Sequence, residues 1–312
     1  MPKYLIISNP NAGSGAGRRA IGKIEPALEA LHLDFDIRIT ERPGHAAELA
    51  REAALGDYDV IVAAGGDGTS NEVLNGIMEA SQLGHRSAAM GILCAGRGND
   101  FADAVGIPAD LTEACRLLAT NQRRQIDIGR VTGGHVPQGR YFGNCVGIGF
   151  DAIGTIEAAK LPRLGGFFSF LIAVLKTILL YHQGPLATIE YDGQTLTQSS
   201  LMISTMNGRR LGGGFLMAPQ AEVDDGLFDL CIARQVSRIR ILRLIPHFLR
   251  GTQASQPSIF SGRASQIKVT AIEGVLPAQA DGEIISINGD QLEIELLPRQ
   301  LVMICPSPGG MY

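Results

Sequence analysis

AAGGDGTSNEVLNG, residues 63–76, follows an apolar run that starts at Tyr58 and precedes a helical pattern. This order predicts a strand, a tight glycine loop and a helix N-terminus. Backbone N–H groups at a helix N-terminus lack intrahelical partners, and glycines allow close approach to the backbone and positive φ. The loop is therefore expected to hold phosphate. Asp67 would repel phosphate unless a divalent cation or an ordered set of donors lay between them. A plain strand-to-helix turn with an acidic cap is the alternative.

The chain up to about residue 120 alternates strand-like and helix-like patterns. The expected strands are Tyr4–Ser8, Phe35–Thr40, Val60–Ala64 and Ala89–Leu93. The expected helices are Arg18–Leu31, His45–Leu55, Asn71–Ala80 and Leu111–Ala119. This alternation predicts a parallel sheet covered on both faces. Ligands of such sheets bind at the carboxyl ends of the strands, and the segments that fall there are Asn9, Thr40, Gly65–Asp67 and Cys94–Gly98.

From about Gln125 the pattern changes to short strand-like runs separated by turn residues. The runs are Gln125–Val131, Tyr141–Gly147, Leu186–Tyr191, Leu201–Thr205, Phe228–Ala233, Ile267–Thr270, Ile284–Ile287 and Leu292–Leu296. Their regular spacing predicts a β-sandwich. The pair Asn288-Gly289 lies between the last two runs and is a strong hairpin signal.

Composition limits the class of protein. The chain has 312 residues, 45% of them hydrophobic and 19% charged, which is enough for two globular domains. A net charge of −4 argues against nucleic acid as a partner. The five cysteines form no Cys-x-x-Cys pair, and the six histidines show no metal-ligand spacing. No signal peptide is evident, so we expect a cytoplasmic protein.

Gly65–Gly76 resembles the signature of the diacylglycerol-kinase catalytic family, which includes bacterial lipid kinases related to sphingosine and ceramide kinases. Further motifs resemble the same family in the same order: Asn9–Gly13, Gly96–Ala102, Gly212–Gly226 and Ala280–Glu283. The resemblance implies a Rossmann-like, parallel-sheet ATP-binding domain at residues 1–126 and a β-sandwich lipid-substrate domain at residues 127–298. It also implies that residues 299–312 return to the first domain, with Leu301–Cys305 as the last strand.

The family resemblance implies an ATP-dependent lipid kinase that uses Mg²⁺. Such an enzyme transfers the γ-phosphate to a lipid hydroxyl, most naturally that of diacylglycerol, to give phosphatidic acid. Arg97 departs from the family, which usually carries Thr there, and it would contact phosphate through its guanidinium. The residues implied to bind ATP are Asn9, Pro10, Asn11, Ala12, Gly13, Thr40, Gly66, Asp67, Gly68, Thr69, Ser70, Asn71, Glu72 and Arg97.

The resemblance also implies roles for several acidic residues. Asp281 is implied to be the general base, with Glu283 either orienting it or contacting substrate, because phosphorylation of an alcohol needs a proton acceptor. Asp225 and the backbone carbonyls of Glu222 and Leu227 are implied to bind a structural magnesium, although Asp225-Gly226 could form a plain turn. An acid–water–magnesium network is implied for Asp67, Asp100 and Asp127.

Membrane contact is expected to be peripheral. The longest apolar run, Phe167–Tyr181, is too short to span a bilayer and forms either a core helix or part of an acyl-chain site. Arg240, Arg243, His247 and Arg250 recur at helical spacing, which suits either a solvated face or a face drawn to anionic lipid. Pro246 weakens the helix prediction there. The sequence leaves a homodimer open.

Two other functions compete with the lipid kinase. NAD kinase and phosphofructokinase also use a Gly-Gly-Asp-Gly loop, but Asn71-Glu72, Gly98-Asn99-Asp100 and Asp281-Gly282-Glu283 argue against them. A non-catalytic nucleotide sensor on the same fold would be favoured by loss of the late acid, and Asp281 is present.

Overall fold

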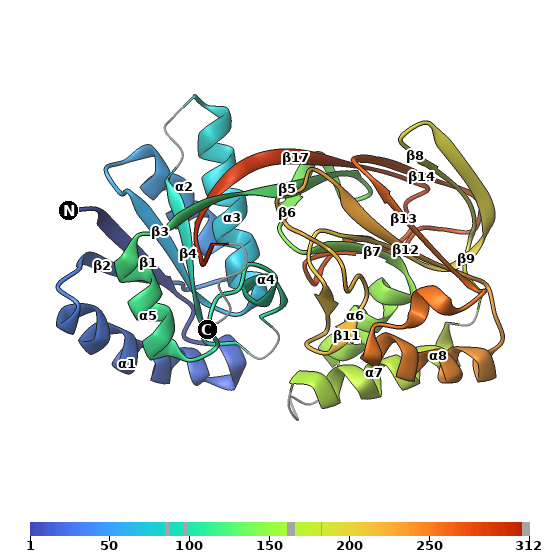
Figure 1. Ribbon diagram of the computed structural model, residues 1–312, viewed down its shortest axis with the longest axis horizontal. Coiled ribbons are helices and arrows are strands. Elements are labelled where there is room, and N and C mark those ends of the chain that lie inside the picture. The colour runs from blue at the N-terminus through green and yellow to red at the C-terminus, as the bar shows by residue number, and fades with distance from the viewer. Residues whose placement is uncertain (85–87, 97–98, 161–165, 182, 308–312) are drawn as a thin grey trace. The chain divides into compact units, whose positions relative to one another are not determined.

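A computed structural model describes residues 1–84, 88–96, 99–160, 166–181 and 183–307. The chain divides into two compact units. Unit 1 comprises Met1–Ile126 and Arg299–Tyr312, and unit 2 comprises Asp127–Pro298 (Figure 1).

Unit 1 is built on a parallel sheet with the strand order β4-β3-β1-β2. Its strands are β1 Lys3–Ser8, β2 Asp34–Ile39, β3 Val60–Gly65 and β4 Ala89–Cys94. The end of the long strand β17 (Gln291–Ile304) adds to the sheet beside β4, where Met303 pairs with Met90 in parallel. Apolar residues fill β3 and β4, and both strands are buried along their whole length, as expected for a sheet that is covered on both faces.

Two pairs of helices cover the strands of unit 1, and a short helix follows β4. The helices are α1 Ala16–Ala30, α2 His45–Leu55, α3 Asp67–Gln82, α4 Asp100–Ala104 and α5 Leu111–Thr120, with a 3-10 turn at Ala12–Ser14. Helix α1 packs against α5, and α2 packs against α3 (Figure 1). Gly76 allows the second contact, because a Cβ atom there would lie 2.2 Å from the carbonyl oxygen of Ala47.

Unit 2 is a β-sandwich with antiparallel pairing, so the expected fold class of the whole chain is confirmed. Its strands are the second part of β5 (Arg123–Gly133), β6 Val136–Phe142, β7 Cys145–Gly149, β8 Leu186–Tyr191, β9 Gln194–Met206, β10 Arg210–Leu211, β11 Phe215–Leu216, β12 Phe228–Arg234, β13 Ile259–Ala264, β14 Gln266–Glu273, β15 Ala278–Ala280, β16 Glu283–Ser286 and the first part of β17. Strand β9 links the two layers, because its first half pairs with β8 and its second half pairs with β7 and β12.

Three helices lie on the β-sandwich of unit 2: α6 Phe150–Lys160, α7 Gly166–Leu180 and α8 Arg238–Arg250, with a 3-10 turn at Gln253–Ser255. Helix α7 packs against both α6 and α8 (Figure 1). Arg238 ties α8 to the last turn of α7, since its guanidinium donates to the carbonyl oxygens of Ile178 at 3.2 Å and Leu179 at 3.0 Å. Helix α8 continues through Pro246, so the doubt about this helix was wrong.

Two expectations for local structure in unit 2 were also wrong. The run Tyr141–Gly147 is two strands, β6 and β7, separated by a corner at Gly143 and Asn144. Asn288-Gly289 forms no hairpin, because β16 pairs with β15 whereas β17 pairs with β14. The hydrophobic pattern of each strand determines which strand it pairs with. This pairing outweighs the local preference of Asn288-Gly289 for a hairpin turn.

Candidate functional site

Three loops of unit 1 converge backbone to backbone at the carboxyl ends of β1, β3 and β4. The N–H group of Ala95 donates to the carbonyl oxygen of Gly65 at 2.8 Å. A Cβ atom on Gly96 would lie 2.4 Å from the Cα atom of Gly66, and one on Gly13 would lie 2.8 Å from the carbonyl oxygen of Ala95. Only glycine permits this packing, which leaves backbone groups accessible where a larger residue would place a side chain.

Asn9 joins the first loop to the start of α3. Its backbone N–H donates to the carbonyl oxygen of Ala64 at 3.0 Å, and its side-chain amide donates to the hydroxyl of Thr69 at 3.2 Å. Its side-chain oxygen accepts a hydrogen bond from the N–H of Asn11 at 3.0 Å. The structure therefore brings together the predicted segments Asn9–Gly13 and Gly66–Ser70.

Helix α3 begins at Asp67, four residues earlier than expected, so the glycine loop is much shorter than the sequence pattern suggested. Gly66 is the N-cap residue with φ of −105° and ψ of −170°, and no side chain caps the helix start. Positive φ was the wrong reason for glycine at this position, because the packing against Gly96 is what excludes a side chain. An uncapped first turn offers N–H groups to an anion, and Gly68 and Thr69 lie in it, whereas the N–H of Ser70 donates to the carbonyl oxygen of Gly66 at 3.0 Å.

Other predicted ATP-binding residues mainly fix neighbouring elements. The two carboxylate oxygens of Glu72 accept hydrogen bonds from the N–H groups of Gly44 at 2.9 Å and Ala46 at 3.0 Å, which anchors the start of α2. Asp67 accepts from the N–H of Phe101 at 3.4 Å, at the start of α4. Buried Thr40 donates its N–H to the carbonyl oxygen of Ser8 at 2.9 Å.

The remaining predicted residues of unit 1 lie close to the same loops or outside the description. Pro10 and Ala12 lie in the first loop, where the N–H of Ala12 donates to the carbonyl oxygen of Asn9 at 3.2 Å. Asn71 is buried and accepts a hydrogen bond from the side-chain amide of Asn75. Arg97 lies outside the described residues, so its expected phosphate contact stays a prediction.

Asp281 of unit 2 is held by the corner that divides β6 from β7. Its carboxylate accepts three backbone hydrogen bonds, from the N–H groups of Gly143 at 2.7 Å, Asn144 at 3.0 Å and Cys145 at 2.9 Å. The residue is only 8% exposed and adopts φ of +47°, in the left-handed region. Glu283 begins β16 two residues later and is exposed. The backbone of the corner therefore orients Asp281.

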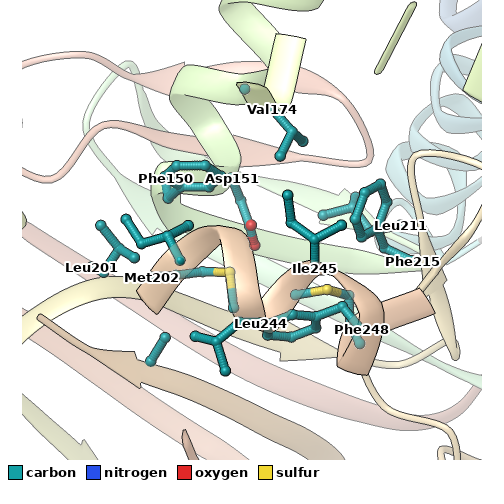
Figure 2. Close-up of a pocket in the computed structure, with 14 residues that line it drawn as sticks. Phe150, Asp151, Val174, Leu201, Met202, Leu211, Phe215, Leu244, Ile245 and Phe248 are labelled. Atoms are coloured by element: carbon teal, nitrogen blue, oxygen red, sulfur yellow. The ribbon is translucent and has the colours of Figure 1, made fainter. Parts of the chain in front are cut away.

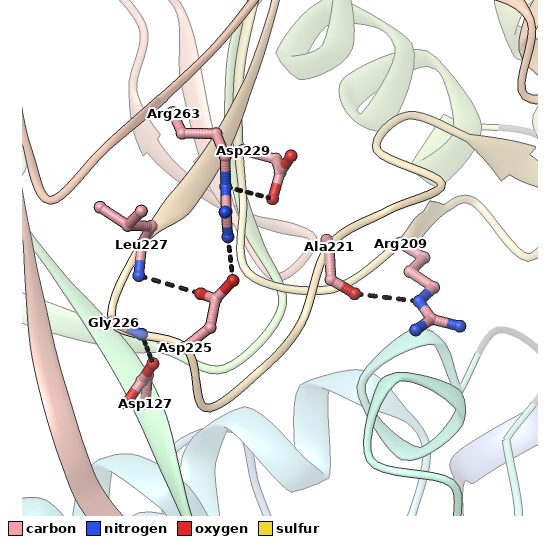
Figure 3. A network of polar contacts seen from close by, with 8 residues as sticks. All are labelled: Asp127, Arg209, Ala221, Asp225, Gly226, Leu227, Asp229 and Arg263. Carbon is pink, nitrogen blue, oxygen red and sulfur yellow. Dashed lines mark hydrogen bonds and ion pairs between the residues drawn. The ribbon is translucent and has the colours of Figure 1, made fainter. Parts of the chain in front are cut away.

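Hydrogen bonds and an ion pair with other groups of unit 2 hold the loop that was expected to bind magnesium (Figure 3). Asp225 forms an ion pair with Arg263 and accepts a hydrogen bond from the N–H of Leu227 at 3.1 Å. Asp127 accepts from the N–H of Gly226 at 2.7 Å, and Arg209 donates to the carbonyl oxygen of Ala221 at 2.9 Å. Both oxygens of Asp225 thus already have donors.

Four acids, Asp127, Glu222, Asp225 and Asp229, lie around this loop, against the two arginines Arg209 and Arg263. Burial, with a smaller contribution from the charge of Glu222, raises the pKa of Asp229 above its ordinary value. The Nε atom of Arg263 lies 3.7 Å from Oδ2 of Asp229. Hard oxygen donors with an excess of negative charge suit Mg²⁺, but the ion could reach Asp225 only if Arg263 moved away.

Within the described part of the chain, no group of three or more His, Cys, Asp or Glu side chains is arranged to hold a metal ion. Asp67 and Asp100 belong to unit 1 and Asp127 to unit 2, so the expected network of these three acids stays a prediction. Asp127 belongs to unit 2 and is fully buried, where it fixes Gly226.

A second feature of unit 2 is an apolar cavity beneath α6, α7 and α8, whose lining includes Val174 of the run Phe167–Tyr181 (Figure 2). Among the described residues that line it, Asp151, in the first turn of α6, is the one that is charged. Burial raises the pKa of the Asp151 carboxyl to about 7, while a hydrogen bond from the hydroxyl of Ser204 acts in the opposite direction. The available sequence signal was a single acid within the otherwise uncharged run 145–156.

Helices α7 and α8 also expose apolar side chains on the faces that point away from the cavity. The most exposed of these residues is Leu179, at 68%, and the others are Ile172, Leu175, Leu180, Ile239, Leu242 and Leu249. Arg243 and Arg250 are exposed on α8, whereas Arg240 is half-buried and donates to the side chain of Gln256 at 3.4 Å. No helix in the described part of the chain is both long enough and apolar enough to cross a membrane.

A parallel α/β unit joined in sequence to an antiparallel β-sandwich is a fold that kinases of more than one kind share. Residues 3–131 match the family model of the diacylglycerol kinase catalytic domain. Residues 144–305 match that of the YegS C-terminal NAD kinase beta sandwich-like domain.

Individual relatives agree with the family models. A diacylglycerol kinase of Bacillus subtilis (strain 168) is 32% identical over 286 residues, which cover 91% of this chain and 90% of the relative. One of Staphylococcus carnosus (strain TM300) is 26% identical over 279 residues, covering 89% and 87%. The chain belongs to the diacylglycerol kinase family and is a lipid kinase.

Solved structures show the same fold. A diacylglycerol kinase from Bacillus anthracis str. Sterne has a TM-score of 0.74 and 26% identity, covering 99% of this chain and 98% of that one. Yeast NADH kinase has a TM-score of 0.53 at 11% identity, covering 99% and 84%, which shows a likeness of fold alone.

Replacing Asp281 is expected to lower the stability of the fold. Asp281→Ala removes the acceptor of three buried N–H groups and should lower the melting temperature by about 5–10 °C. The exposed Glu283→Gln is the matched control and should shift it by no more than about 1 °C. Thermal denaturation of both variants checks this, and equal melting temperatures would show that the corner does not need the carboxylate.

The buried carboxyl of Asp151 makes stability depend on pH. Between about pH 4 and pH 7 the folded chain keeps a proton on Asp151 that the unfolded chain has released, so this group's contribution to the free energy of unfolding falls as pH rises through that window. Asp151→Asn cannot ionise. Its free energy of unfolding, relative to that of the natural chain, should therefore increase by about 2–3 kcal/mol from pH 5 to pH 8.

Urea denaturation at the two pH values measures the Asp151 effect. The exposed Asp34→Asn is the control, and its difference from the natural chain should stay constant. A constant difference for Asp151→Asn as well would mean that Asp151 is ionised throughout this range.

Proposed function

We propose that this lipid kinase transfers the γ-phosphate of ATP to a lipid hydroxyl, with diacylglycerol as the acceptor and phosphatidic acid as the product. The observation that carries the proposal is the convergence of the loops after β1, β3 and β4 around the uncapped start of α3. Parallel sheets bind ligands at this edge, and the first turn of a helix favours phosphate. The family supplies the reaction class.

In this proposal the backbone of unit 1 binds the phosphates of ATP. The N–H groups of Gly68 and Thr69 meet the phosphate chain, Ser70 contributes its side-chain hydroxyl, and the loop Asn9–Gly13 closes over the nucleotide. Thr40 and Arg97 complete the site, the latter through its guanidinium. Glu72 and Asp67 act by holding α2 and α4 in place, which their hydrogen bonds support. Mg²⁺ enters as the counter-ion of the ATP phosphates.

Asp281 is proposed to accept the proton of the lipid hydroxyl. Its three backbone hydrogen bonds fix the carboxylate, and a base that is already oriented loses little entropy in the reaction. The same bonds engage both oxygens, which leaves exposed Glu283 as the alternative acceptor. Comparing kcat of Asp281→Asn and Glu283→Gln, each corrected for its folded fraction, decides between them. The base is the residue whose substitution lowers kcat by a factor on the order of 10²–10⁴.

Two rival activities share the fold. A kinase of NAD or of a sugar phosphate would release ADP with those acceptors, and a nucleotide sensor would bind ATP without turnover. Measuring ADP release with diacylglycerol, NAD and fructose 6-phosphate separates the three outcomes. We expect ADP above the no-acceptor rate with diacylglycerol only. ADP release with NAD alone, or binding of ATP without any release, would overturn the proposal.

Gly66→Val should weaken ATP binding by at least about tenfold. A Cβ atom at Gly66 lies 3.3 Å from the Cα atom of Gly96, so the larger side chain must push the two loops apart. Gly22→Ala in α1 is the control, because a Cβ atom there meets nothing within 4 Å. Isothermal titration calorimetry with ATP checks both variants, and equal affinity in Gly66→Val would remove this loop from the nucleotide site.

Docking at a membrane surface is proposed to use the exposed faces of α7 and α8. Leu175 and Leu179 supply apolar area, and Arg243 and Arg250 each contribute about 1 kcal/mol toward an anionic surface, screened by salt. Replacing both leucines with Ser should lower binding to vesicles at any salt concentration. Replacing both arginines with Ala should lower it only at low salt. Vesicle co-sedimentation measures both, and unchanged binding in the two double variants would show that this surface is simply solvated.

The loop of Glu222, Asp225 and Leu227 is proposed to bind Mg²⁺ in competition with Arg263. Arg263→Ala removes the competing cation, so its melting temperature should rise with lower Mg²⁺ concentrations than that of the natural chain. Arg263→Ala combined with Asp225→Ala is the control that lacks the charged ligand. If added Mg²⁺ shifts the single and double variants equally, the loop is not a metal site.

A further inference from the structure

Asp281 lies at the tip of a two-residue hairpin in unit 2. Strands β15 and β16 pair at Ala280 and Glu283. Asp281 and Gly282 are thus the two central residues of the turn, and their φ angles are +47° and +87°. Positive φ at both central positions is the mark of a type I′ turn, which suits an Asp-Gly pair. The hairpin therefore sets the left-handed backbone of Asp281.

Hydrogen bonds fix this turn through both of its central N–H groups. That of Asp281 donates to the carbonyl oxygen of Cys145 in β7 at 3.0 Å. That of Gly282 takes no part in the turn's own hydrogen bond, which joins the residues on either side of the central pair. It donates instead to the side-chain oxygen Oε1 of Gln279 at 2.7 Å. The backbone of β7 thus holds one central residue, and a side chain holds the other.

The sheet accommodates the side chain of Gln279. This residue lies in β15, between β7 and β16, and is fully buried. Its amide nitrogen Nε2 donates to the Sγ atom of Cys145 at 3.6 Å, which leaves Oε1 for Gly282. Gly147 of β7 is the residue opposite, and a Cβ atom there would lie 2.7 Å from Nε2. Glycine at this position therefore leaves room for the glutamine amide.

Packing alone does not account for a glutamine at this position. Burying an amide costs free energy that an apolar side chain of the same size avoids. The core of unit 2 contains apolar side chains of similar size, such as Ile285 and Leu292. Gln279 therefore needs a reason beyond the filling of space, and its bond to the residue that follows Asp281 supplies one.

We propose that Gln279 is a positioning residue of the phosphorylation reaction, which fixes the turn that presents the carboxylate of Asp281 to the lipid hydroxyl. The inference rests on the proposed function, in which Asp281 accepts the proton, and it names a residue that acts through Asp281. Cys145 links the two side chains. Its N–H donates to Oδ1 of Asp281 at 2.9 Å, and its Sγ accepts from Gln279.

Water competes with Gln279 for the N–H of Gly282. Gly282 is exposed, so without Oε1 its N–H would turn toward solvent and the tip of the hairpin would rotate. Asp281 is the neighbouring residue in that turn, and its carboxylate would leave its position at the corner Gly143–Cys145. Misplacing a reacting group by about 1 Å can lower a rate about 10²-fold. Loss of the acceptor is therefore expected to lower the rate of phosphoryl transfer more than it lowers stability.

Two substitutions of Gln279 separate positioning from packing. Gln279→Met has a similar length and volume but offers no oxygen to the N–H of Gly282. Gln279→Glu keeps an oxygen acceptor in a side chain of the same shape. If Gln279 positions the turn, the Glu variant is the faster enzyme. If Gln279 only fills space, the Met variant is faster, because a carboxyl group is costlier to bury than a thioether.

Gln235→Met is the matched control. The Oε1 atom of Gln235 also accepts a hydrogen bond from a glycine N–H, that of Gly184, at 2.8 Å. Gln235 follows β12 at the end that pairs with Ser200 of β9, whereas Cys145 pairs with Met206 of the same strand. The rise of a strand separates these two points by about 20 Å. The control therefore loses the same kind of hydrogen bond far from Asp281.

Steady-state kinetics of the full chain with ATP and dioctanoylglycerol in mixed micelles test the inference, with each rate divided by the folded fraction. We expect Gln279→Met to lower kcat at least about tenfold while KM for ATP changes less than about twofold. Gln279→Glu should stay within about fivefold of the natural kcat, and Gln235→Met within about twofold. A kcat of Gln279→Met that equals or exceeds that of Gln279→Glu would overturn the inference.

Hydrogen exchange of the turn gives a readout that needs no activity. The N–H of Gly282 should be protected in the natural chain and in Gln279→Glu, and it should exchange at least about tenfold faster in Gln279→Met. An unprotected Gly282 in the natural chain would overturn the inference whichever variants fold. Failure of the proposed function is distinct, because the exchange rates would differ as expected while the natural chain phosphorylates no lipid.

Discussion

The backbone contact between Gly66 and Gly96 governs the architecture of unit 1. Two parallel strands, β3 and β4, end side by side, and their loops touch with no side chain between them. Any larger residue at Gly96 would place its Cβ atom 2.4 Å from the Cα atom of Gly66. Because no side chain fills this edge, the first turn of α3 stays uncapped, and the same constraint that packs the loops produces the proposed phosphate site.

Unit 2 contains an acid that backbone hydrogen bonds fix in place, Asp281, and a separate apolar region formed by α6, α7 and α8. The chain turns a corner at Gly143–Cys145 and so forms two strands, β6 and β7, in place of one long strand. The three N–H groups of this corner donate hydrogen bonds to the carboxylate of Asp281. The helices α6, α7 and α8 bury a second acid, Asp151, among apolar side chains. In the loop of Glu222, Asp225 and Leu227, Arg263 balances the charge of Asp225.

Much of the fold was predictable from the sequence because each unit has one regular pattern. Strand-like and helix-like segments alternate in unit 1, and short strand-like runs follow one another in unit 2. The helix His45–Leu55 was predicted with its observed bounds, and the strands of unit 1 were placed within a residue or so. The errors lie where tertiary contacts decide. Helix α3 starts at Asp67 because Gly66 can be extended against Gly96, and Asn288-Gly289 makes no hairpin because β16 and β17 have different partners. The hydrogen bonds of Glu72 and Asp281 join residues far apart in sequence, and no local pattern encodes them. Asp151 was missed because one acid in an apolar run carries no motif.

The decisive measurement is the fate of the γ-phosphate. The purified chain is incubated with [γ-³²P]ATP, Mg²⁺ and dioctanoylglycerol in mixed micelles, and the lipid extract is separated by thin-layer chromatography. The structure and the family predict label in phosphatidic acid at a rate that depends on the amount of dioctanoylglycerol. Label that remains in ATP and inorganic phosphate, or that appears on NAD when this is supplied, would contradict the assignment of the loops and of Asp281 to the phosphorylation of a lipid.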